Sequence, residues 1–569
     1  MQKYLKPVIL TLLLVFLATF LIHQINLPTD DLGRHIKAGE IIVKDFSVPD
    51  TNLFSYAEPD HPFINHHWLS EVIFYAFYST IGFSGLVVLK VLILIIAFGL
   101  VYYIAIKRSG FWTSSIFAFL AILIFVERTD VRPEIFSYLF LSLYLFIFYL
   151  YSQGKQKYLW YLIPIQLLWV NMHIYFFLGP FLILVFLASQ IIKSKDLTVW
   201  QKIKLHFNIK SGDNSSIKKI VIVAFSIFAS LLLNPNSIKG AVYPLLVLKN
   251  YGYDIVENKS PFFLEDLMVN PSIYFFKILI ILLIVGIVLN HRRITLFDFL
   301  TGAFAIFLGW FALRNFPITA LLALPVLSVS FHQSFEKLFL FLKDKLKGNL
   351  KFIEFGFSII VIVFLIVISN ANYNKQTEFA KAGKPSGIGL TVNSESSAKF
   401  YLENNITGPV FNNFDIGSYL DFYLYPESQT FVDNRPEAFN VEFWQYTYIP
   451  AQSDWDWWQV FSAHYQFNSV FFGHTDGTGW GKTFLERIIK ADAWVTVYLD
   501  QHAIILVRDT KNNEKLINQY EISTEEVKKR LNNYKMDKAT IIENKELEES
   551  RKKGFDYINK LLGPGVASY

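Results

Sequence analysis

Residues 84–106 read SGLVVLKVLILIIAFGLVYYIAI, an almost unbroken apolar run. A helix of this length reaches across a hydrocarbon core of about 30 Å. Similar runs recur along the first two thirds of the chain, and together they predict a polytopic α-helical membrane protein. We expect about eleven spans, at residues 7–25, 84–106, 111–126, 134–152, 157–170, 174–192, 218–235, 272–290, 297–313, 316–333 and 353–371.

The composition agrees with lipid as the main solvent of the chain. Hydrophobic residues make up 53% of the 569 residues and charged residues only 17%, which is an apolar excess for a soluble domain. The chain contains no cysteine. Disulfides, thiolate nucleophiles and cysteine metal ligands are therefore excluded.

Basic residues predict how the chain is oriented. Lys3 and Lys6 precede the first span, which has no small-residue cleavage site and is expected to stay as a helix with the N-terminus inside. The stretch from Lys193 to Lys219 and the pair Arg292-Arg293 fall on the same side as the N-terminus, which is the positive-inside pattern. An odd number of spans then places the C-terminal part outside. We therefore expect a multi-pass protein of the cytoplasmic (inner) membrane.

The chain divides into three parts by composition. Residues 1–371 form the expected transmembrane domain, with a first outer loop at residues 26–83. Residues 372–510 alternate short apolar stretches with turns and helical stretches, which predicts an extracytoplasmic α/β domain. Residues 511–569 are rich in Lys and Glu and predict a charged helical tail. We expect the α/β domain to lie over the outer loop through exposed rings of Trp444, Trp455, Trp457 and Trp458, and the alternative is that these rings fill the domain core.

The first outer loop carries two carboxylate–imidazole pairs. Two short helices are expected to lie there along the membrane surface, at residues 29–45 and 68–80. Asp31 and His35 are four residues apart in the first, and His67 and Glu71 are four apart in the second, so each pair projects from one helix face. Such pairs serve as general acid and base, or bind a divalent cation if both pairs converge. Surface ion pairs, which are common and weak, are the alternative.

Other outer-facing turns carry polar residues at the membrane interface, where ionisable groups are costly and usually line a cavity or serve a function. These residues are Arg132, Asn171, His173 and Arg314. Arg132 and Arg314 suit a phosphate, because a guanidinium makes bidentate bonds to phosphate oxygens and stays charged when partly buried. A lipid-linked phosphate would arrive from the bilayer at this depth. For a single residue such as Arg128, snorkelling from a helix end is the alternative.

A series of short motifs runs through the chain: Asp31-Leu32-Gly33-Arg34-His35 with Gly39-Glu40, Val48-Pro49-Asp50-Thr51-Asn52-Leu53-Phe54-Ser55-Tyr56, His67-Trp68-Leu69-Ser70-Glu71, Arg132-Pro133-Glu134-Ile135-Phe136-Ser137-Tyr138, Asn171-Met172-His173, Leu233-Asn234-Pro235-Asn236, Arg314-Asn315-Phe316-Pro317, Phe411-Asn412, Gly417-Ser418-Tyr419-Leu420 and Phe431-Val432-Asp433-Asn434-Arg435. These motifs resemble a large bacterial family of the GT-C superfamily, the polyprenyl-phosphate-dependent membrane glycosyltransferases, and the resemblance spans about residues 5–508.

The resemblance implies sugar transfer from a lipid phosphate, with Asp31 as general base or metal-associated acid. Together with the loop pairs and the outer turns it gives a candidate site. The catalytic residues are Asp31, His35 and Glu71, and the substrate-binding residues are Arg34, His67, Arg132, Asn171, His173 and Arg314. The sequence departs from the wider superfamily because Asp31 is followed by Leu32 and Gly33, so the second acid of a DxD-type pair is missing. The metal ligands stay unassigned, and a divalent metal ion is an open alternative.

We therefore expect a membrane glycosyltransferase that uses a polyprenyl-phosphate-linked sugar donor at the outer leaflet to modify a glycan, lipid or protein acceptor. The expected partners are this lipid-linked donor, membrane lipid and envelope proteins, and no nucleic acid. One alternative is a non-catalytic GT-C-like scaffold or polysaccharide-handling membrane subunit. A transporter is the third reading, although midplane charges and paired broken helices, which favour one, are not evident.

Overall fold

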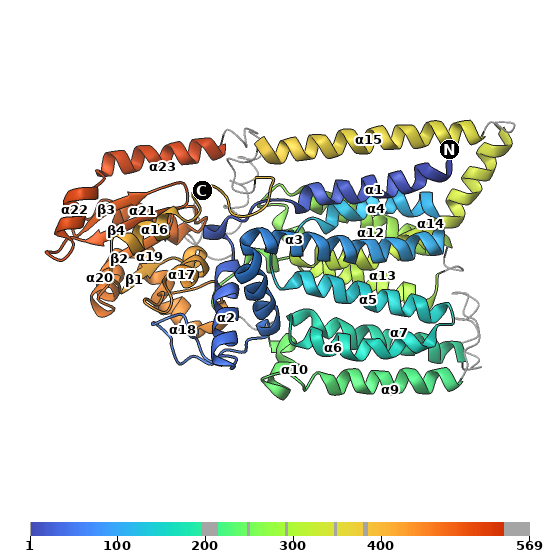
Figure 1. Cartoon of the computed structure of the whole chain (residues 1–569), viewed down its shortest axis with the longest axis horizontal. Coiled ribbons are helices and arrows are strands. Elements are labelled where there is room, and N and C mark those ends of the chain that lie inside the picture. Colours follow the sequence, from blue (N-terminus) through green and yellow to red (C-terminus); the bar gives the residue numbers. More distant parts are fainter. Residues whose placement is uncertain are drawn as a thin grey trace.

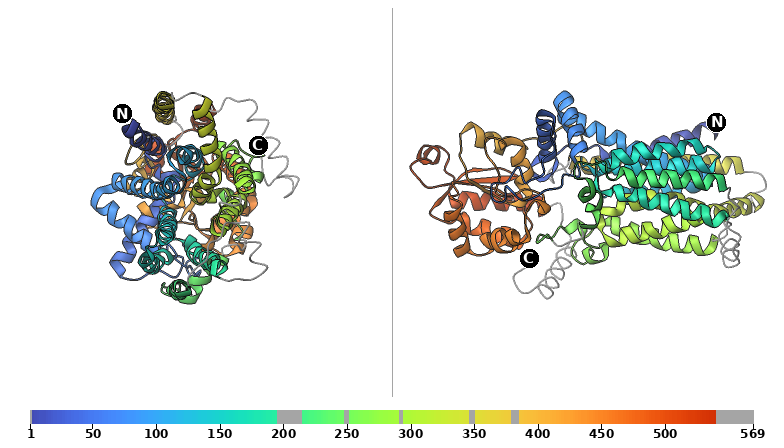
Figure 2. Two further views of the ribbon diagram at one scale, coloured as in Figure 1. Left: turned by 90° about the vertical axis from the view of Figure 1, so that its right-hand side faces the viewer. Right: turned by 90° about the horizontal axis from the view of Figure 1, so that it is seen from below.

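The computed structural model describes residues 2–194, 214–246, 251–290, 294–345, 350–378 and 385–539. A bundle of long helices forms one end of the molecule and a smaller domain with a β-sheet forms the other (Figure 1). The N-terminus lies at the end of the bundle that is far from the sheet (Figures 1 and 2). The predicted fold class, a helical polytopic membrane protein with a C-terminal α/β domain, is confirmed. The basic stretches at 195–213 and 291–293 and the tail from residue 540 lie outside the described residues.

Every predicted span coincides with a helix. Within the described residues, seven helices are long and apolar enough to cross a membrane, and two shorter apolar helices accompany them. The long ones are α1 (Gln2–Leu21), α3 (Trp68–Ser109), α5 (Glu134–Ser152), α7 (Leu178–Ser194, with the preceding 3₁₀ turn η3, Ile174–Phe177), α12 (Pro271–Asn290), α14 (Phe316–Lys345, after η5, Leu313–Asn315) and α15 (Leu350–Glu378). The shorter ones are α4 (Phe111–Phe125) and α13 (Leu296–Phe311). The two remaining spans coincide with η2 and α6 (Gln156–Tyr161 and Leu162–Val170) and with α9 (Asn214–Ser230).

The first outer loop forms the two helices that the sequence predicts. The first is α2 (Leu32–Asp45), which follows the 3₁₀ turn η1 (Leu27–Thr29). The second is the start of α3, which changes direction at Gly82, where φ is 72° and only glycine is unstrained. Residues 68–81 therefore stand beside α2, and the rest of α3 runs with the bundle (Figure 1).

The C-terminal domain is built on a four-stranded sheet in the order β1-β2-β4-β3. β1 and β2 are parallel, and β4 is antiparallel to both of its neighbours. The strands are β1 (Val410–Asn412), β2 (Ser469–Gly473), β3 (Trp494–Leu499) and β4 (Ala503–Arg508). Its helical elements are α16 (Ser396–Glu403), η7 (Phe414–Ile416), α17 (Gly417–Leu424), η8 (Pro436–Ala438), α18 (Val441–Phe443), η9 (Trp444–Tyr448), α19 (Ile449–Ser453), α20 (Trp455–His464) and α21 (Gly479–Ile488).

The C-terminal domain rests on the first outer loop, as the sequence analysis expects. Ser55 Oγ donates to the Phe431 carbonyl at 2.7 Å, and Ser55 forms a parallel bridge with Thr430. Asn52 Nδ2 donates to the Ala438 carbonyl at 3.0 Å. The loop is thus fixed between the bundle and the sheet domain.

The prediction that the four tryptophan rings are exposed over the outer loop is wrong for two of them. Trp444 and Trp458 are 0% and 1% exposed and lie in the core of the C-terminal domain, so the alternative interpretation holds for this pair. The Trp444 ring packs against Phe414, and the Trp458 ring packs against Phe411. Burial of such large aromatic rings in the domain core stabilises the fold more than their exposure to solvent would. Trp457 is half exposed.

Two further helices follow the sheet, α22 (Glu514–Tyr520) and α23 (Thr524–Ala539). Val527 of α23 is fully buried in the core of the C-terminal domain. The described part of the charged tail therefore packs on that domain.

Candidate functional site

The candidate site begins where α2 begins. The Leu32 N–H donates to Asp30 Oδ1 at 3.2 Å, which satisfies one of the free amides at the start of α2. The next carboxylate, Asp31, makes no side-chain bond to the start of the helix, and its Oδ2 lies 3.5 Å from Arg132 Nη1. About a quarter of the Asp31 side chain is exposed. Asp31 is thus a half-buried carboxylate that faces an arginine from the turn between α4 and α5.

Arg132 belongs to a cluster of arginines and glutamates between the bundle and the outer loop. Arg128 forms ion pairs with Glu134 and with Glu257 of η4 (Val256–Asn258). Arg132 Nη1 lies 3.7 Å from Glu257 Oε2. Arg128 is only 8% exposed and is held by two carboxylates, so it does not snorkel.

Arg314 joins this cluster from η5. Its Nη1 donates to Asn258 Oδ1 at 2.8 Å, and its Nη2 lies 4.0 Å from Glu134 Oε2. Burial opposes ionisation of Glu257, but the charges of Arg128, Arg132 and Arg314 lower its pKa to about 2. Within the described residues, the buried Nε atoms of Arg132 and Arg314 have no hydrogen-bond partner. Each of these two guanidiniums therefore has an N–H group that could donate a hydrogen bond to an anion.

His35 and Glu71 form a second cluster between α2 and α3. The His35 Nδ1 lies 2.9 Å from Glu71 Oε1, and both side chains are 2% exposed. Asn65 Nδ2 donates to the other oxygen of Glu71 at 2.6 Å. The ring of His67 meets that of His35 at 5.4 Å, and the potential ligand atoms of His35, His67 and Glu71 all lie within 4.8 Å of one another. Burial and the charge of Arg34 hold the pKa of His35 well below its usual value.

The predicted convergence of the two loop pairs is therefore confirmed for His35, His67 and Glu71. The expected pairing of Asp31 with His35 is wrong, because His35 bonds to Glu71 across the helices and Asp31 faces Arg132 instead. Asp31 precedes the first turn of α2, so the four-residue spacing does not place it on the helix face of His35.

His173 and Asn171 lie in the turn after α6, beside these clusters. The ring of His173 is 5.3 Å from that of His67, and its Nδ1 contacts Ser137 Oγ at 2.9 Å. Asn171 accepts a bond from the Trp68 indole at 2.8 Å and donates to two backbone carbonyls. The Asn171 side chain thus holds the outer turns together.

Arg34 connects the loop to the C-terminal domain. Its backbone N–H donates to Ser418 Oγ at 2.9 Å, and the residue is 8% exposed. Its Nε is a further buried donor without a partner in the described residues. Arg34 also contributes positive charge around Glu71 and Glu437.

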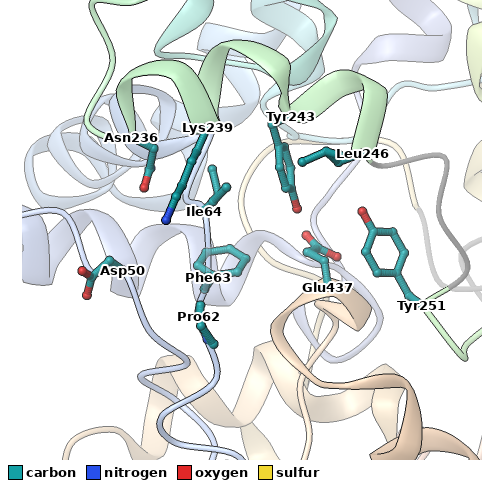
Figure 3. Close-up of a pocket in the computed structure, with 10 residues that line it drawn as sticks. All are labelled: Asp50, Pro62, Phe63, Ile64, Asn236, Lys239, Tyr243, Leu246, Tyr251 and Glu437. Atoms are coloured by element: carbon teal, nitrogen blue, oxygen red, sulfur yellow. The ribbon is translucent and has the colours of Figure 1, made fainter.

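A pocket of about 320 Å³ opens beside the histidines (Figure 3). The outer loop, α10 (Ser237–Leu246) and the C-terminal domain all contribute to its wall. Figure 3 shows the hydroxyls of Tyr243 and Tyr251 on either side of the Glu437 carboxylate, with Lys239 farther along the same pocket. The Tyr243 ring contacts that of His66 at 5.0 Å, and His66 packs on His67 at 3.8 Å. The pocket is therefore one ring away from the histidine cluster.

Several solved structures are similar to this chain. The archaeal oligosaccharyltransferase AglB from Archaeoglobus fulgidus, in complex with an inhibitory peptide and a dolichol-phosphate, is 12% identical, with 89% of this chain and 74% of that chain covered at a TM-score of 0.51. ArnT from Cupriavidus metallidurans, bound to undecaprenyl phosphate, is 11% identical, with 90% and 98% covered at 0.46. The arabinofuranosyltransferase AftD from Mycobacteria is 11% identical, with 90% and 40% covered at 0.45. No protein-family model and no curated protein matches the sequence.

The chain has a GT-C-like fold. At such low identity the likeness concerns the fold and leaves the site to be argued from this chain's own residues. In this fold α2 of the first outer loop lies between the bundle and the C-terminal domain (Figure 1). Asp31 of the loop contacts Arg132 of the arginine cluster, and Arg34 contacts Ser418 of the C-terminal domain.

Sequence reasoning missed several residues of the candidate site and its surroundings. Glu134 was noted only as part of a motif, and Glu257 was not noted, although both pair with arginines. Lys90 is a further omission: it is fully buried in α3, and its Nζ lies 3.0 Å from His23 Nε2. A lysine inside an apolar run is a visible signal, because charges in membrane spans are rare and usually paired.

Proposed function

We propose that this protein transfers a glycosyl group from a polyprenyl-phosphate-linked sugar to an acceptor at the outer leaflet. The observation that carries this proposal is the Asp31 carboxylate 3.5 Å from Arg132, at the end of a bundle where three arginines gather. The GT-C-like fold supports it, because the AglB structure with the same fold was solved with a dolichol-phosphate. The acceptor class stays broad: a glycan, a lipid or a protein.

Asp31 is the proposed general base. The C1–O bond between sugar and phosphate breaks while a C1–O bond to the acceptor hydroxyl forms, and Asp31 takes the hydroxyl proton. A carboxylate fits this role because it is partly exposed and precedes the helix, so an acceptor can approach it. The proton then passes from Asp31 to solvent, and the enzyme returns to its starting state.

Arg132 and Arg314 are proposed to bind the phosphate that leaves. Negative charge grows on the bridging oxygen as the C1–O bond breaks, and preorganised donors stabilise it. Each arginine has a buried Nε without a partner in the described residues. Glu134 and Glu257 hold the cluster in place before the anion arrives.

The pocket in Figure 3 is the proposed place for the acceptor. Its wall combines tyrosine hydroxyls, the carboxylates of Asp50 and Glu437, and the Lys239 ammonium (Figure 3). Aromatic rings together with hydrogen-bond donors and acceptors suit a ligand that carries many hydroxyl groups. The His66 ring lies between Tyr243 of this wall and His67 of the buried cluster.

We further infer the sidedness and the domain division. With the N-terminus inside, the C-terminal domain and the first outer loop lie outside the cytoplasmic membrane. The last expected span, at residues 353–371, lies within α15, and this helix continues to Glu378. The domain from residue 385 includes α22 and α23, because Val527 is part of its core.

Replacement of one carboxylate tests the proposed chemistry. Asp31→Asn keeps the size and hydrogen-bonding capacity of the side chain but removes the basic lone pair. In vesicles supplied with a polyprenyl-phosphate hexose with a radiolabelled sugar, we expect transfer of label to fall at least about 100-fold, the size of a general-base contribution. Asp30→Asn is the matched control, because an asparagine Oδ1 still accepts from Leu32 and activity should be retained.

The outcome separates the enzyme from a scaffold. Equal abundance of both variants, with transfer lost only in Asp31→Asn, supports the proposal. Full transfer by Asp31→Asn, Arg132→Ala and Arg314→Ala would leave the non-catalytic scaffold as the better interpretation.

A further inference from the structure

We propose that His35, His67 and Glu71 form a binding site for a transition-metal ion of the zinc type. Among the residues that the structure describes, they are a group of three side chains whose potential ligand atoms lie within 4.8 Å of one another. The ligands come from α2 and from the start of α3, on either side of the seam between the two loop helices.

The distances suit a metal after small side-chain adjustments. Zinc binds imidazole nitrogen and carboxylate oxygen at about 2.0–2.2 Å, so tetrahedral ligand atoms are about 3.4 Å apart. His35 and Glu71 are already 2.9 Å apart through Nδ1 and Oε1. His67 completes the group, since its ring meets the His35 ring edge to face at 5.4 Å.

The donor set selects the kind of metal. Two imidazoles and one carboxylate are the ligands of zinc sites that keep a fourth position for water or substrate. Magnesium and calcium prefer oxygen ligands throughout, so a site with two histidines disfavours them. The chain has no cysteine, and this site needs none.

Neighbouring residues hold the ligand side chains in position through hydrogen bonds and ring contacts. Asn65 Nδ2 donates to Glu71 Oε2 at 2.6 Å, which fixes the carboxylate while leaving Oε1 for the metal. The Nδ1 of His66 lies 3.1 Å from the Ile64 carbonyl, and the His66 ring packs on His67 at 3.8 Å. A buried carboxylate is costly unless its charge is compensated, and a divalent cation would compensate it.

The bound metal would fasten α2 to α3 beside the pocket in Figure 3. Asp31 directly precedes α2, which carries His35, so fixing this helix also fixes the position of the proposed base. The His66 ring connects His67 to Tyr243 of the pocket wall.

Metal titration of the purified full chain tests this site. The protein in detergent is stripped with a chelator and titrated with Zn²⁺ alone, and bound metal is counted by elemental mass spectrometry. We expect about one ion per chain, because each such site holds one metal. Loading with Co²⁺ should give the visible absorption of a four-coordinate ion.

Two variants and a control localise the binding. His67→Phe keeps an aromatic ring beside His66 but removes a ligand, and Glu71→Gln keeps the size of the side chain and an acceptor for Asn65 but removes the charge. We expect both to bind Zn²⁺ at least about 10-fold more weakly while melting near the wild-type temperature, since even loss of a supporting group costs that much. His61→Ala, a histidine of the same loop outside the cluster, should bind like the wild type.

Equal zinc binding by wild type and His67→Phe, or no binding by either, would overturn the proposal and leave a hydrogen-bonded packing cluster. The experiment uses no sugar donor. Metal binding and the proposed glycosyl transfer can therefore fail separately.

Discussion

Asp415 is a carboxyl whose burial is costly at neutral pH. It lies in η7, where the C-terminal domain meets η1 of the outer loop. Burial, followed by the charges of Asp476 and Asp31, raises the pKa of Asp415 to about 7. The folded state therefore holds a proton that the unfolded chain releases near pH 4, and stability should fall as the pH rises from about 4 to about 7.

Asp415→Asn should remove this dependence. The amide is neutral at every pH, so the variant should match the wild type near pH 4 and melt several degrees higher at pH 8. Thermal unfolding of the detergent-solubilised protein across this pH range measures the effect. Asp492→Asn, which replaces an exposed carboxyl, is the control and should follow the wild-type curve. A wild-type-like slope in Asp415→Asn would contradict the assignment.

At the scale of elements, the seam between α2 and α3 depends on a glycine. A Cβ at Gly39 would lie 2.1 Å from the Glu71 carbonyl oxygen and 2.9 Å from the Tyr75 Cβ. A backbone carbonyl cannot move aside cheaply, so Gly39→Ala should push α2 away from α3 and lower stability by about 1–3 kcal/mol. His35 lies one turn earlier on α2, so its bond to Glu71 should be lost as well.

Melting temperature and zinc binding in the same preparation check this prediction. Gly99→Ala is the matched control, because its Cβ meets nothing within 4 Å in the interior of α3. Alanine is the better helix former there, so Gly99→Ala should melt at or slightly above the wild-type temperature. If both variants melt alike, close approach at Gly39 does not position α2.

The elements show what the sequence could predict and what it could not. The spans were predictable because a long apolar run in lipid forms a helix, in which the backbone N–H and C=O groups bond to one another within the segment. The proximity of His67 and Glu71 was predictable because a four-residue spacing brings side chains to one helix face. The bond between His35 and Glu71 joins two helices, so the spacing within one helix does not predict it. The partners of Arg128 were not predictable either, because Glu257 lies 129 residues away and no local pattern joins them. Burial of Trp444 also depends on distant residues, such as Phe414 and Tyr253.

At the scale of the whole molecule, the site exists only because three distant parts of the chain meet. The loop supplies Asp31, and the bundle supplies Arg132. The C-terminal domain closes over both, with Ser418 bonded to the backbone of Arg34. Arg435 adds a second clasp, because its Nη2 donates to Asn52 Oδ1 at 2.8 Å. The assembly places the proposed chemistry on whichever side of the membrane holds the C-terminal domain.

The side of the membrane that holds the C-terminal domain can be determined by cysteine labelling. The chain has no cysteine, so a single introduced cysteine is the only thiol that a maleimide can label. Glu427 is exposed in the C-terminal domain, and Gln153 is exposed after α5. The 19 residues of α5 separate Gln153 from Glu134 of the arginine cluster by about 28 Å along the bundle. A membrane-impermeant maleimide should label Glu427→Cys from outside the cytoplasmic membrane and Gln153→Cys only in inverted vesicles. The reverse labelling would overturn the orientation and move the proposed sugar transfer to the inner face, whereas labelling of both from one side would contradict α5 as a span.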